Sequence, residues 1–147
     1  MIDVAAALRS EVERAAVGFR RLTDSDVLRD RGQGKWVKKE ILGHLIDSAA
    51  NNHQRFVRAQ IANPFIGPGY DQQTWVQVQR YRERPWLELV ELWVGLNRHV
   101  AWIIENVPAD RLQTSCTIGD REPMSLEWGM RDYLRHLRHH LEQLAGE

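Results

Sequence analysis

Apolar residues recur every three or four positions in four long stretches of the chain, and this spacing places them along one face of a helix. The pattern predicts four helices, over about residues 2–22, 37–61, 85–107 and 125–144. The third stretch is the most regular, because Pro85 occupies a favoured first helical position and Pro108 ends the pattern. Four helices of this length are typical of a four-helix bundle, so we expect an all-α fold and a single domain over residues 1–147.

The connectors predict how these helices are joined. The longest is about 22 residues (63–84), with two prolines near its start and the pattern of a short helix near residues 72–81. A connector of this length can cross a bundle whose helices are about 30 Å long, so the second and third helices can run parallel, unlike the usual up-down-up-down order. Residues 23–34 are expected to form a loop or a broken turn. Residues 113–124, which contain a Gly-Asp turn, are expected to form a small hairpin.

The second predicted helix differs from the others in its apolar stripe. Ser48 and Asn52 stand where an ordinary bundle more often has leucine or isoleucine. Small polar side chains at these positions leave room in the interior and offer hydrogen-bonding groups. The pattern therefore indicates a cavity or a polar site beside this helix.

Composition excludes several classes of function. Twenty basic residues balance 20 acidic ones, so no excess of positive charge is available for binding nucleic acid. No apolar run reaches the roughly 18–20 residues of a membrane span, and the N-terminus lacks the residue order of a signal peptide. Cys116 is the only cysteine, which fits a reducing compartment. We therefore expect a cytoplasmic protein with neither a nucleic-acid nor a membrane partner.

Helical geometry can bring together three of the six histidines. His136 and His140 are four residues apart, so they lie on one face of the fourth helix, and His44 lies beside the apolar stripe of the second. Imidazoles from two facing helices can hold one divalent metal ion, and three protein ligands leave positions open for water or substrate. Asp47 and Asp132 lie three and four residues from these histidines, and either can orient an imidazole through its other nitrogen.

A metal site is one interpretation of these histidines. Most pairs at this spacing are ordinary surface residues, and the three side chains can also pack as neutral groups in a bundle without a metal. Other metal motifs are absent from the sequence. The pair lacks the glutamate that follows the first histidine in zincin proteases, and no Glu-x-x-His pair of the di-iron bundles occurs. The residues alone support an open three-histidine site as a hypothesis.

Five further side chains are candidates for contacting a substrate. They are Asn51 and Arg55 on the second helix, Tyr70 and Trp75 in the long connector, and Tyr133 near the histidine pair. An arginine that points inward can bind a substrate carboxylate with two hydrogen bonds, whereas a boundary arginine usually forms a structural salt bridge. The sequence leaves both roles open for Arg55.

Two segments carry the most specific motifs of the chain, residues 34–47 (GKWVKKEILGHLID) and residues 136–143 (HLRHHLEQ). They resemble the Trp-Ser-x-x-Glu-x-x-x-His-x-x-Asp stretch and the His-x-x-x-His-x-x-Gln ending of the DinB-like superfamily of metal-binding four-helix proteins. Val37 departs from the family pattern of Ser or Thr, so Glu40 lacks the partner of a capping box. The resemblance implies an up-down-down-up bundle and a metal site formed by His44, His136 and His140.

The same resemblance implies a chemistry. The metals of this family are commonly zinc or nickel, its members are often homodimers, and characterised relatives include thiol-dependent S-transferases and a mycothiol-dependent maleylpyruvate isomerase. We therefore expect a metal-dependent enzyme that activates a low-molecular-weight thiol against an electrophilic small molecule. Hydrolysis by metal-bound water is the alternative among enzymes. A non-enzymatic module, in which the metal ties two helices together or supports a dimer, is the alternative outside them.

Overall fold

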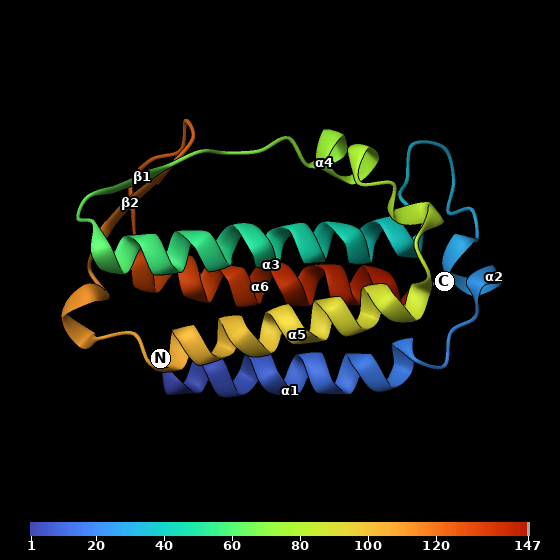
Figure 1. Cartoon of the computed structure of the whole chain (residues 1–147), viewed down its shortest axis with the longest axis horizontal. Coiled ribbons are helices and arrows are strands. Elements are labelled where there is room, and N and C mark those ends of the chain that lie inside the picture. Colours follow the sequence, from blue (N-terminus) through green and yellow to red (C-terminus); the bar gives the residue numbers. More distant parts are fainter. Residues whose placement is uncertain (147) are drawn as a thin grey trace.

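Four long helices form the body of the protein in a computed structural model that describes residues 1–146 (Figure 1). They are α1 (Ile2–Phe19), α3 (Lys38–Ile61), α5 (Trp86–Glu105) and α6 (Leu126–Ala145). The four predicted helices are confirmed, and no end differs from its prediction by more than three residues. The periodic apolar pattern was therefore sufficient to locate the main elements of the fold.

The segment between α1 and α3 contains a short helix where a loop was expected. Helix α2 (Asp24–Leu28) begins with two reciprocal hydrogen bonds: Thr23 Oγ1 accepts from Asp26 N at 3.3 Å, and Asp26 Oδ2 accepts from Thr23 N at 2.8 Å. This capping box satisfies backbone donors at the start of the helix. Helix α3 begins with one half of a capping box. Glu40 Oε2 accepts a hydrogen bond from Val37 N at 3.0 Å, whereas Val37 has no side-chain acceptor for the reciprocal bond.

The arrangement of the long helices brings α3 and α6 together. The colours of Figure 1 show that α1 and α6 run from left to right, whereas α3 and α5 run from right to left. Helix α3 packs against α5 and α6, and α1 packs against the same two helices. The two helices that carry the candidate histidines are therefore antiparallel neighbours.

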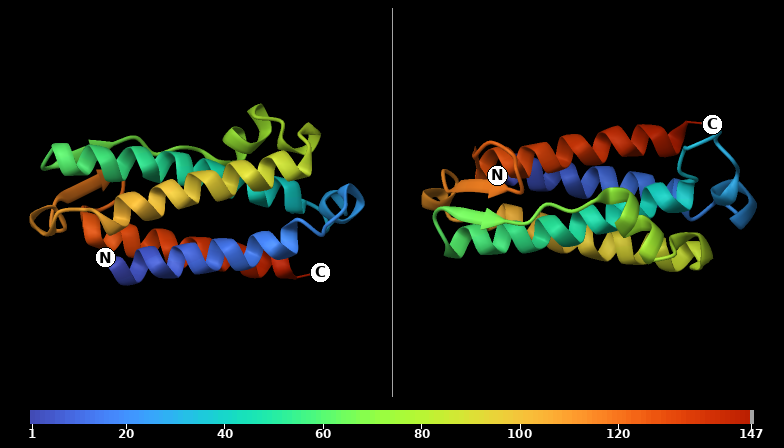
Figure 2. Two further views of the ribbon diagram at one scale, coloured as in Figure 1. Left: turned by 60° about the horizontal axis from the view of Figure 1, so that its bottom comes forward. Right: turned by 90° about the horizontal axis from the view of Figure 1, so that it is seen from above.

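The connector between α3 and α5 returns along α3 (Figures 1 and 2). It holds the strand β1 (Phe65–Gly67), helix α4 (Gln72–Val78) and a turn of 3₁₀ helix, η1 (Tyr81–Glu83), and both α4 and η1 contact α3. Helix α4 confirms the predicted short helix. Asp71 caps it, since Asp71 Oδ1 accepts from Thr74 N at 2.7 Å. The connector therefore adds an ordered layer beside α3.

A three-stranded sheet links this connector to the hairpin that precedes α6. Strands β2 (Ser115–Ile118) and β3 (Met124–Ser125) are antiparallel, which confirms the predicted hairpin. Strand β1 pairs with β2 in parallel, with Phe65 opposite Cys116. The all-α expectation is therefore corrected to a mostly helical fold with a small sheet. Pairing between segments far apart in the sequence leaves no local pattern from which it could be predicted.

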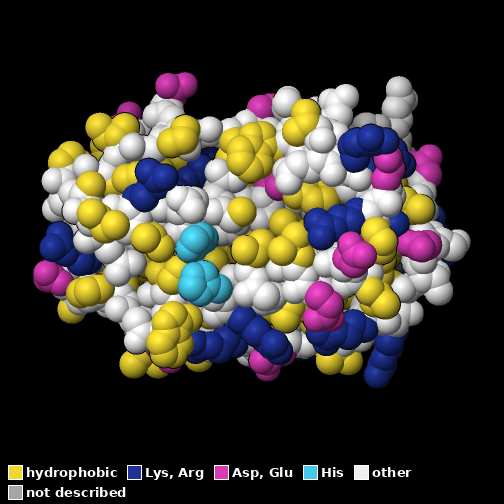
Figure 3. Space-filling model, viewed as in Figure 1, with side chains coloured by type: hydrophobic (Ala, Val, Ile, Leu, Met, Phe, Trp, Pro, Cys, Tyr) yellow, Lys and Arg dark blue, Asp and Glu magenta, His cyan; other side chains and the backbone are white. Residues whose placement is uncertain are grey.

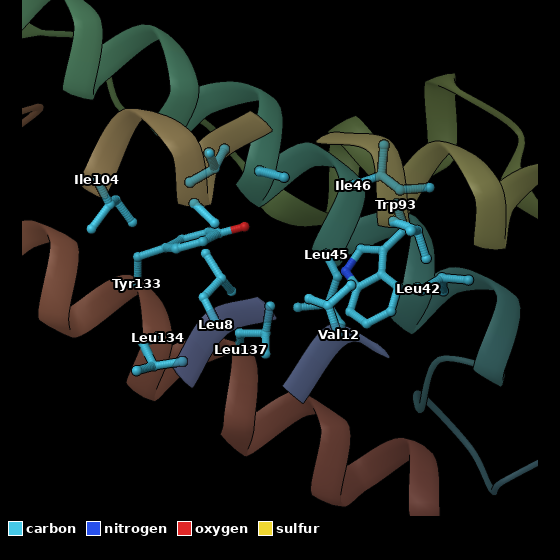
Figure 4. Packing of buried hydrophobic residues seen from close by; sticks show 14 of the residues in the cluster. Leu8, Val12, Leu42, Leu45, Ile46, Trp93, Ile104, Tyr133, Leu134 and Leu137 are labelled. Carbon is cyan, nitrogen blue, oxygen red and sulfur yellow. The ribbon is translucent and has the colours of Figure 1, made fainter. Parts of the chain in front are cut away.

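All four long helices contribute to one hydrophobic core (Figure 4). Val12 of α1, Leu45 of α3, Trp93 of α5 and Leu137 of α6 are each no more than 1% exposed. Burying an apolar side chain of this size stabilises a fold by about 1.5–3 kcal/mol, so the core holds α3 and α6 in a fixed relation. None of the helices that the structure describes has both the length and the apolar character needed to cross a bilayer.

Candidate metal centre

Helices α3 and α6 bring three imidazoles to one point. Nε2 of His44 lies 3.2 Å from Nε2 of His136, which lies 3.1 Å from Nε2 of His140. One ring nitrogen of each residue lies within 4.8 Å of the other two. The structure therefore brings together the three histidines that the sequence singles out as candidate ligands.

The arrangement of these nitrogens fits one divalent metal ion. Imidazole nitrogens bind zinc at about 2.0–2.1 Å, so two such ligands at a tetrahedral angle lie about 3.4 Å apart. The observed separations of 3.1 and 3.2 Å are close to this value. The ligand atoms already converge, and a set of three leaves further coordination positions open.

Burial keeps the three imidazoles neutral at pH 7. His44 is completely buried, and this burial, together with the neighbouring His140 and His136, lowers its pKa to about 3. Burial and His140 lower the pKa of His136 to about 4, although the charge of Asp132 opposes the shift. Burial also lowers the pKa of His140. Because a metal ion needs the unprotonated nitrogen, protons compete little for these ligands at neutral pH.

The metal-free protein is expected to lose stability between pH 7 and pH 5. In the unfolded chain an imidazole has a pKa of about 6.5, whereas His44 and His136 stay unprotonated in the folded state until the pH approaches their pKa values of about 3 and about 4. The unfolded state takes up protons first as the pH falls, so stability present above about pH 6.5 is lost. We expect a loss of about 2–4 kcal/mol at pH 5, measured by urea unfolding with a chelator present. The His136→Gln variant should retain only part of this pH dependence. If the wild-type protein were equally stable at pH 7 and pH 5, that result would contradict the burial of neutral imidazoles.

Gln143 orients one of the three imidazoles. Its Oε1 accepts a hydrogen bond from Nδ1 of His140 at 2.9 Å, which leaves Nε2 of His140 free for a metal. The spacing of three residues places both side chains on one face of α6 and is the signal in the sequence that points to Gln143, although no role was predicted for it. The His44 ring packs on Trp36 with centroids 5.3 Å apart, and its Nδ1 is buried without a hydrogen-bond partner in residues 1–146.

Gln143→Leu is expected to weaken metal binding about 10- to 100-fold. Leucine fills a similar volume but cannot accept the hydrogen bond that fixes the tautomer and the orientation of the His140 ring. Gln143→Glu is the matched control, because it retains an acceptor and should bind the metal within a few-fold of the wild type. Competition with a chromogenic zinc chelator measures the three affinities. Equal affinities of Gln143→Leu and the wild type would show that His140 needs no orienting partner.

The two carboxylates that were predicted to orient histidines have other partners. Asp47 is buried and accepts hydrogen bonds from the Tyr81 hydroxyl and the Gln79 amide, both at 2.6 Å. It therefore fastens the connector to α3. Asp132 pairs with Arg135 one turn further along α6. Neither carboxylate hydrogen-bonds an imidazole in the part of the chain that the structure describes, because each points toward a partner outside the histidine cluster.

A cavity of about 390 Å³ opens beside His136, which confirms the cavity expected from Ser48 and Asn52. Its wall comes from α3, the connector, the hairpin turn and α6. Most of the lining side chains are polar, among them Ser48, Asn52, Arg55, Tyr70, Gln72, Asp120, Arg121 and Tyr133. His44 is completely buried, so the histidine side chains visible at the surface in Figure 3 do not include it. The three-histidine cluster therefore borders a space that a small molecule can enter.

Three of the five substrate-binding candidates line this cavity, namely Arg55, Tyr70 and Tyr133. The Arg55 guanidinium lies 5.8 Å from the centroid of the Tyr70 ring. No ion pair joins Arg55 to a carboxylate within the described residues, so the structural salt bridge that the sequence left open is not formed there. Tyr133 is almost completely buried, and its hydroxyl donates to Asn97 Oδ1 at 2.6 Å. The hydroxyl of Tyr133 is therefore already engaged in a buried hydrogen bond.

The other two candidates lie outside the cavity wall. Asn51 donates to the backbone oxygen of Asp47 at 2.9 Å, and Trp75 packs on Tyr70 with ring centroids 4.8 Å apart. Arg121 lines the cavity but was not predicted from the sequence. It belongs to the hairpin turn, and only the pairing of β1 with β2 brings that turn to the cavity. A local sequence pattern contains no signal for this placement.

Comparisons with known proteins place the chain in a family. A protein of Halalkalibacterium halodurans named "Putative metal-dependent hydrolase BH0277" is 22% identical over 123 residues, which are 84% of this chain and 71% of that protein. YfiT from Bacillus subtilis, described as "a probable metal-dependent hydrolase with an unusual four-helix bundle topology", superposes with a TM-score of 0.81 at 20% identity, over 98% of this chain and 81% of that one. This likeness shows the four-helix bundle fold, and the resemblance noted in the two motifs is confirmed. The family model of the DinB superfamily matches residues 6–144, so the chain belongs to the DinB superfamily.

Proposed function

We propose that this protein is a divalent-metal-dependent enzyme that acts on a small molecule bound in the cavity beside His136. The observation that carries the proposal is the convergence of three imidazole nitrogens at the edge of that cavity. A structural zinc site is usually closed by a fourth protein ligand. Among the described residues, no further His, Cys, Asp or Glu joins the three histidines. An open site favours a catalytic role over a purely structural one.

Each protein group has a defined part in this proposal. A divalent ion such as zinc or nickel, held by His44, His136 and His140, would lower the pKa of a water or a thiol bound to it and so supply a nucleophile at neutral pH. Gln143 holds the His140 ring through its hydrogen bond. Burial keeps the imidazoles unprotonated. The cavity wall positions the substrate beside His136.

Two nucleophiles are compatible with this site. Water would make the protein a hydrolase, and both relatives described above carry that name. A low-molecular-weight thiol would make it an S-transferase, which is the activity that the two sequence motifs imply through their resemblance. Thiolate suits zinc and nickel as a ligand, so the donor set accepts either nucleophile.

A two-part substrate screen tests the proposal. Zinc- and nickel-loaded protein is assayed with activated esters and amides in the absence of thiol, and with small electrophiles in the presence of several low-molecular-weight thiols. We expect turnover in one part that depends on the metal and disappears in His136→Gln. Metal binding that raises stability without any turnover would instead support the non-enzymatic module, and turnover that is equal in His136→Gln would contradict the proposed site.

A further inference from the structure

We infer that the cavity beside the metal centre is an oxyanion-binding site, in which Arg55 and Arg121 select small molecules that carry a carboxylate or phosphate group. Its role in catalysis rests on the proposed function, since an anion bound there lies next to His136 of the three-histidine cluster. Binding of the anion itself needs only the two arginines and the cavity.

Arg55 keeps most of its hydrogen-bond donors free. It is half-buried on α3 and makes one hydrogen bond within the described residues, to the backbone oxygen of Pro68 at 3.3 Å. A guanidinium has five N–H groups in a fixed plane, and the Tyr70 ring beside it limits how that plane can turn. A half-buried guanidinium with unused donors is suited to bidentate pairing with a carboxylate or a phosphate.

Arg121 supplies a second guanidinium from a different element. It lies in the turn between β2 and β3, where its backbone N donates to Ile118 O at 3.2 Å. The side chains of Arg121 and Arg55 line the same cavity. Burial lowers the pKa of Arg55, and the charge of Arg121 lowers it further. Because the two like charges face one cavity, an anion between them would relieve their repulsion.

The cavity wall carries an excess of positive charge. Asp120 is the one acidic side chain in this wall, against two arginines, so the lining has one net positive charge. A divalent ion on the neighbouring histidines would raise the excess to three. Elsewhere, arginines are commonly paired with carboxylates, for example Arg9 with Glu105 and Arg131 with Asp3. An anionic ligand would balance a charge that the described residues leave unbalanced.

A smaller neighbouring cavity adds a second requirement for the ligand. The two arginines also border a smaller cavity of about 60 Å³, whose wall includes the apolar Phe56, Phe65 and Met124. The cavity beside His136, at about 390 Å³, lies within the usual range of small-molecule sites. The ligand that fits both spaces is a small molecule with an oxyanion group and a short apolar group attached to it.

Titration of the metal-free protein with inorganic phosphate and with succinate tests this inference. The Nε–Hε signals of arginine are followed in nitrogen-15 NMR spectra and are assigned with Arg55→Gln and Arg121→Gln. We expect both signals to shift together and to saturate at millimolar concentrations. Each substitution is expected to weaken the affinity about ten-fold or more, because each removes a charge-assisted pair. The remaining signals of each variant verify that it is folded.

Arg58→Gln is the matched control for these variants. Arg58 lies on the same helix but is exposed, donates to Gln54 Oε1 at 3.2 Å and lines neither cavity. Its substitution should leave the affinity unchanged. Saturation by only one of the two anions would identify the group that the site selects, and neutral succinamide should produce no shift.

Two results would overturn the inference: no saturation with either anion, or an equal loss of affinity in Arg58→Gln. The titration uses protein without metal, so its outcome does not depend on whether metal-loaded protein turns over a substrate. Failure of the anion site and failure of the proposed enzyme function are therefore distinguishable. Anion binding without turnover would retain the site and reject the enzyme.

Discussion

His44→Gln is expected to bind zinc several hundred-fold more weakly than the wild-type protein. His44 is the one candidate ligand that α3 contributes, and it is completely buried against the two histidines of α6. Structural zinc sites with four ligands bind with about 10–16 kcal/mol, or about 2.5–4 kcal/mol for each ligand, and the middle of that range corresponds to a factor of several hundred. Glutamine fills most of the space of imidazole, so the fold should persist. Competition with a chromogenic chelator measures the affinity, and circular dichroism verifies the helix content.

His53→Gln is the control for this variant. His53 also belongs to α3, but its ring packs on His99 with centroids 5.0 Å apart and takes no part in the three-histidine cluster. Its substitution should leave zinc affinity within about two-fold of the wild type. Equal affinities of His44→Gln and His53→Gln would mean that zinc binds somewhere other than the proposed centre.

Gly43→Ala is expected to destabilise the protein by about 2–4 kcal/mol. A Cβ atom at this position would lie 2.6 Å from Cε2 of Tyr81 and closer still to two other ring atoms. Tyr81 cannot move aside easily, because it is buried and its hydroxyl donates to Asp47 Oδ1. The added methyl group must therefore push η1 away from α3 and weaken this contact. Urea unfolding at pH 7 measures the change in the free energy of unfolding.

Gly95→Ala is the matched control, because it places the same methyl group in another long helix. Gly95 lies on the exposed face of α5, and its added Cβ would meet nothing within 4 Å. Alanine is favoured over glycine within a helix, so this variant should gain about 0.5–1 kcal/mol. Opposite signs for the two variants would establish the close approach of Tyr81 to Gly43. A neutral effect of Gly43→Ala would contradict it.

The fold was predictable where the signal is local and periodic. The apolar stripe from Leu89 to Ile104 and its flanking prolines predicted α5 because both signals lie within one element. The short helix after Thr23 has too few residues to show a period, although its Thr-x-x-Asp capping box was present in the sequence. The pairing of β1 with β2 joins segments on either side of α5, so no single window of sequence contains it.

The part of the site that could be predicted from the sequence is likewise the part that depends on local spacing. The spacing of His136 and His140 places them on one face of a helix, and a facing helix supplies His44. Asp47 has a suitable spacing for orienting His44, but the connector supplies Tyr81 and Gln79 as its partners. No local pattern in the sequence indicates the path of that connector. The role of Arg121 depends on the same tertiary arrangement and could not be predicted for that reason.

Several expectations about partners stay predictions. They concern the small-molecule substrate, the homodimer, the low-molecular-weight thiol, and the absence of nucleic-acid and membrane partners. The balanced charge of the chain, with 20 basic and 20 acidic residues, is the basis of the prediction on nucleic acid. Sedimentation of the metal-loaded protein would determine whether a dimer forms.

Metal content per chain, determined by plasma mass spectrometry on protein purified without an affinity tag, tests the central claim most directly. The convergence of His44, His136 and His140 predicts close to one equivalent of a divalent ion, retained through gel filtration. It also predicts that zinc or nickel restores one equivalent after treatment with a chelator. Protein that carries no metal, and that takes up neither ion when it is supplied, would contradict the claim that these three histidines form a metal centre.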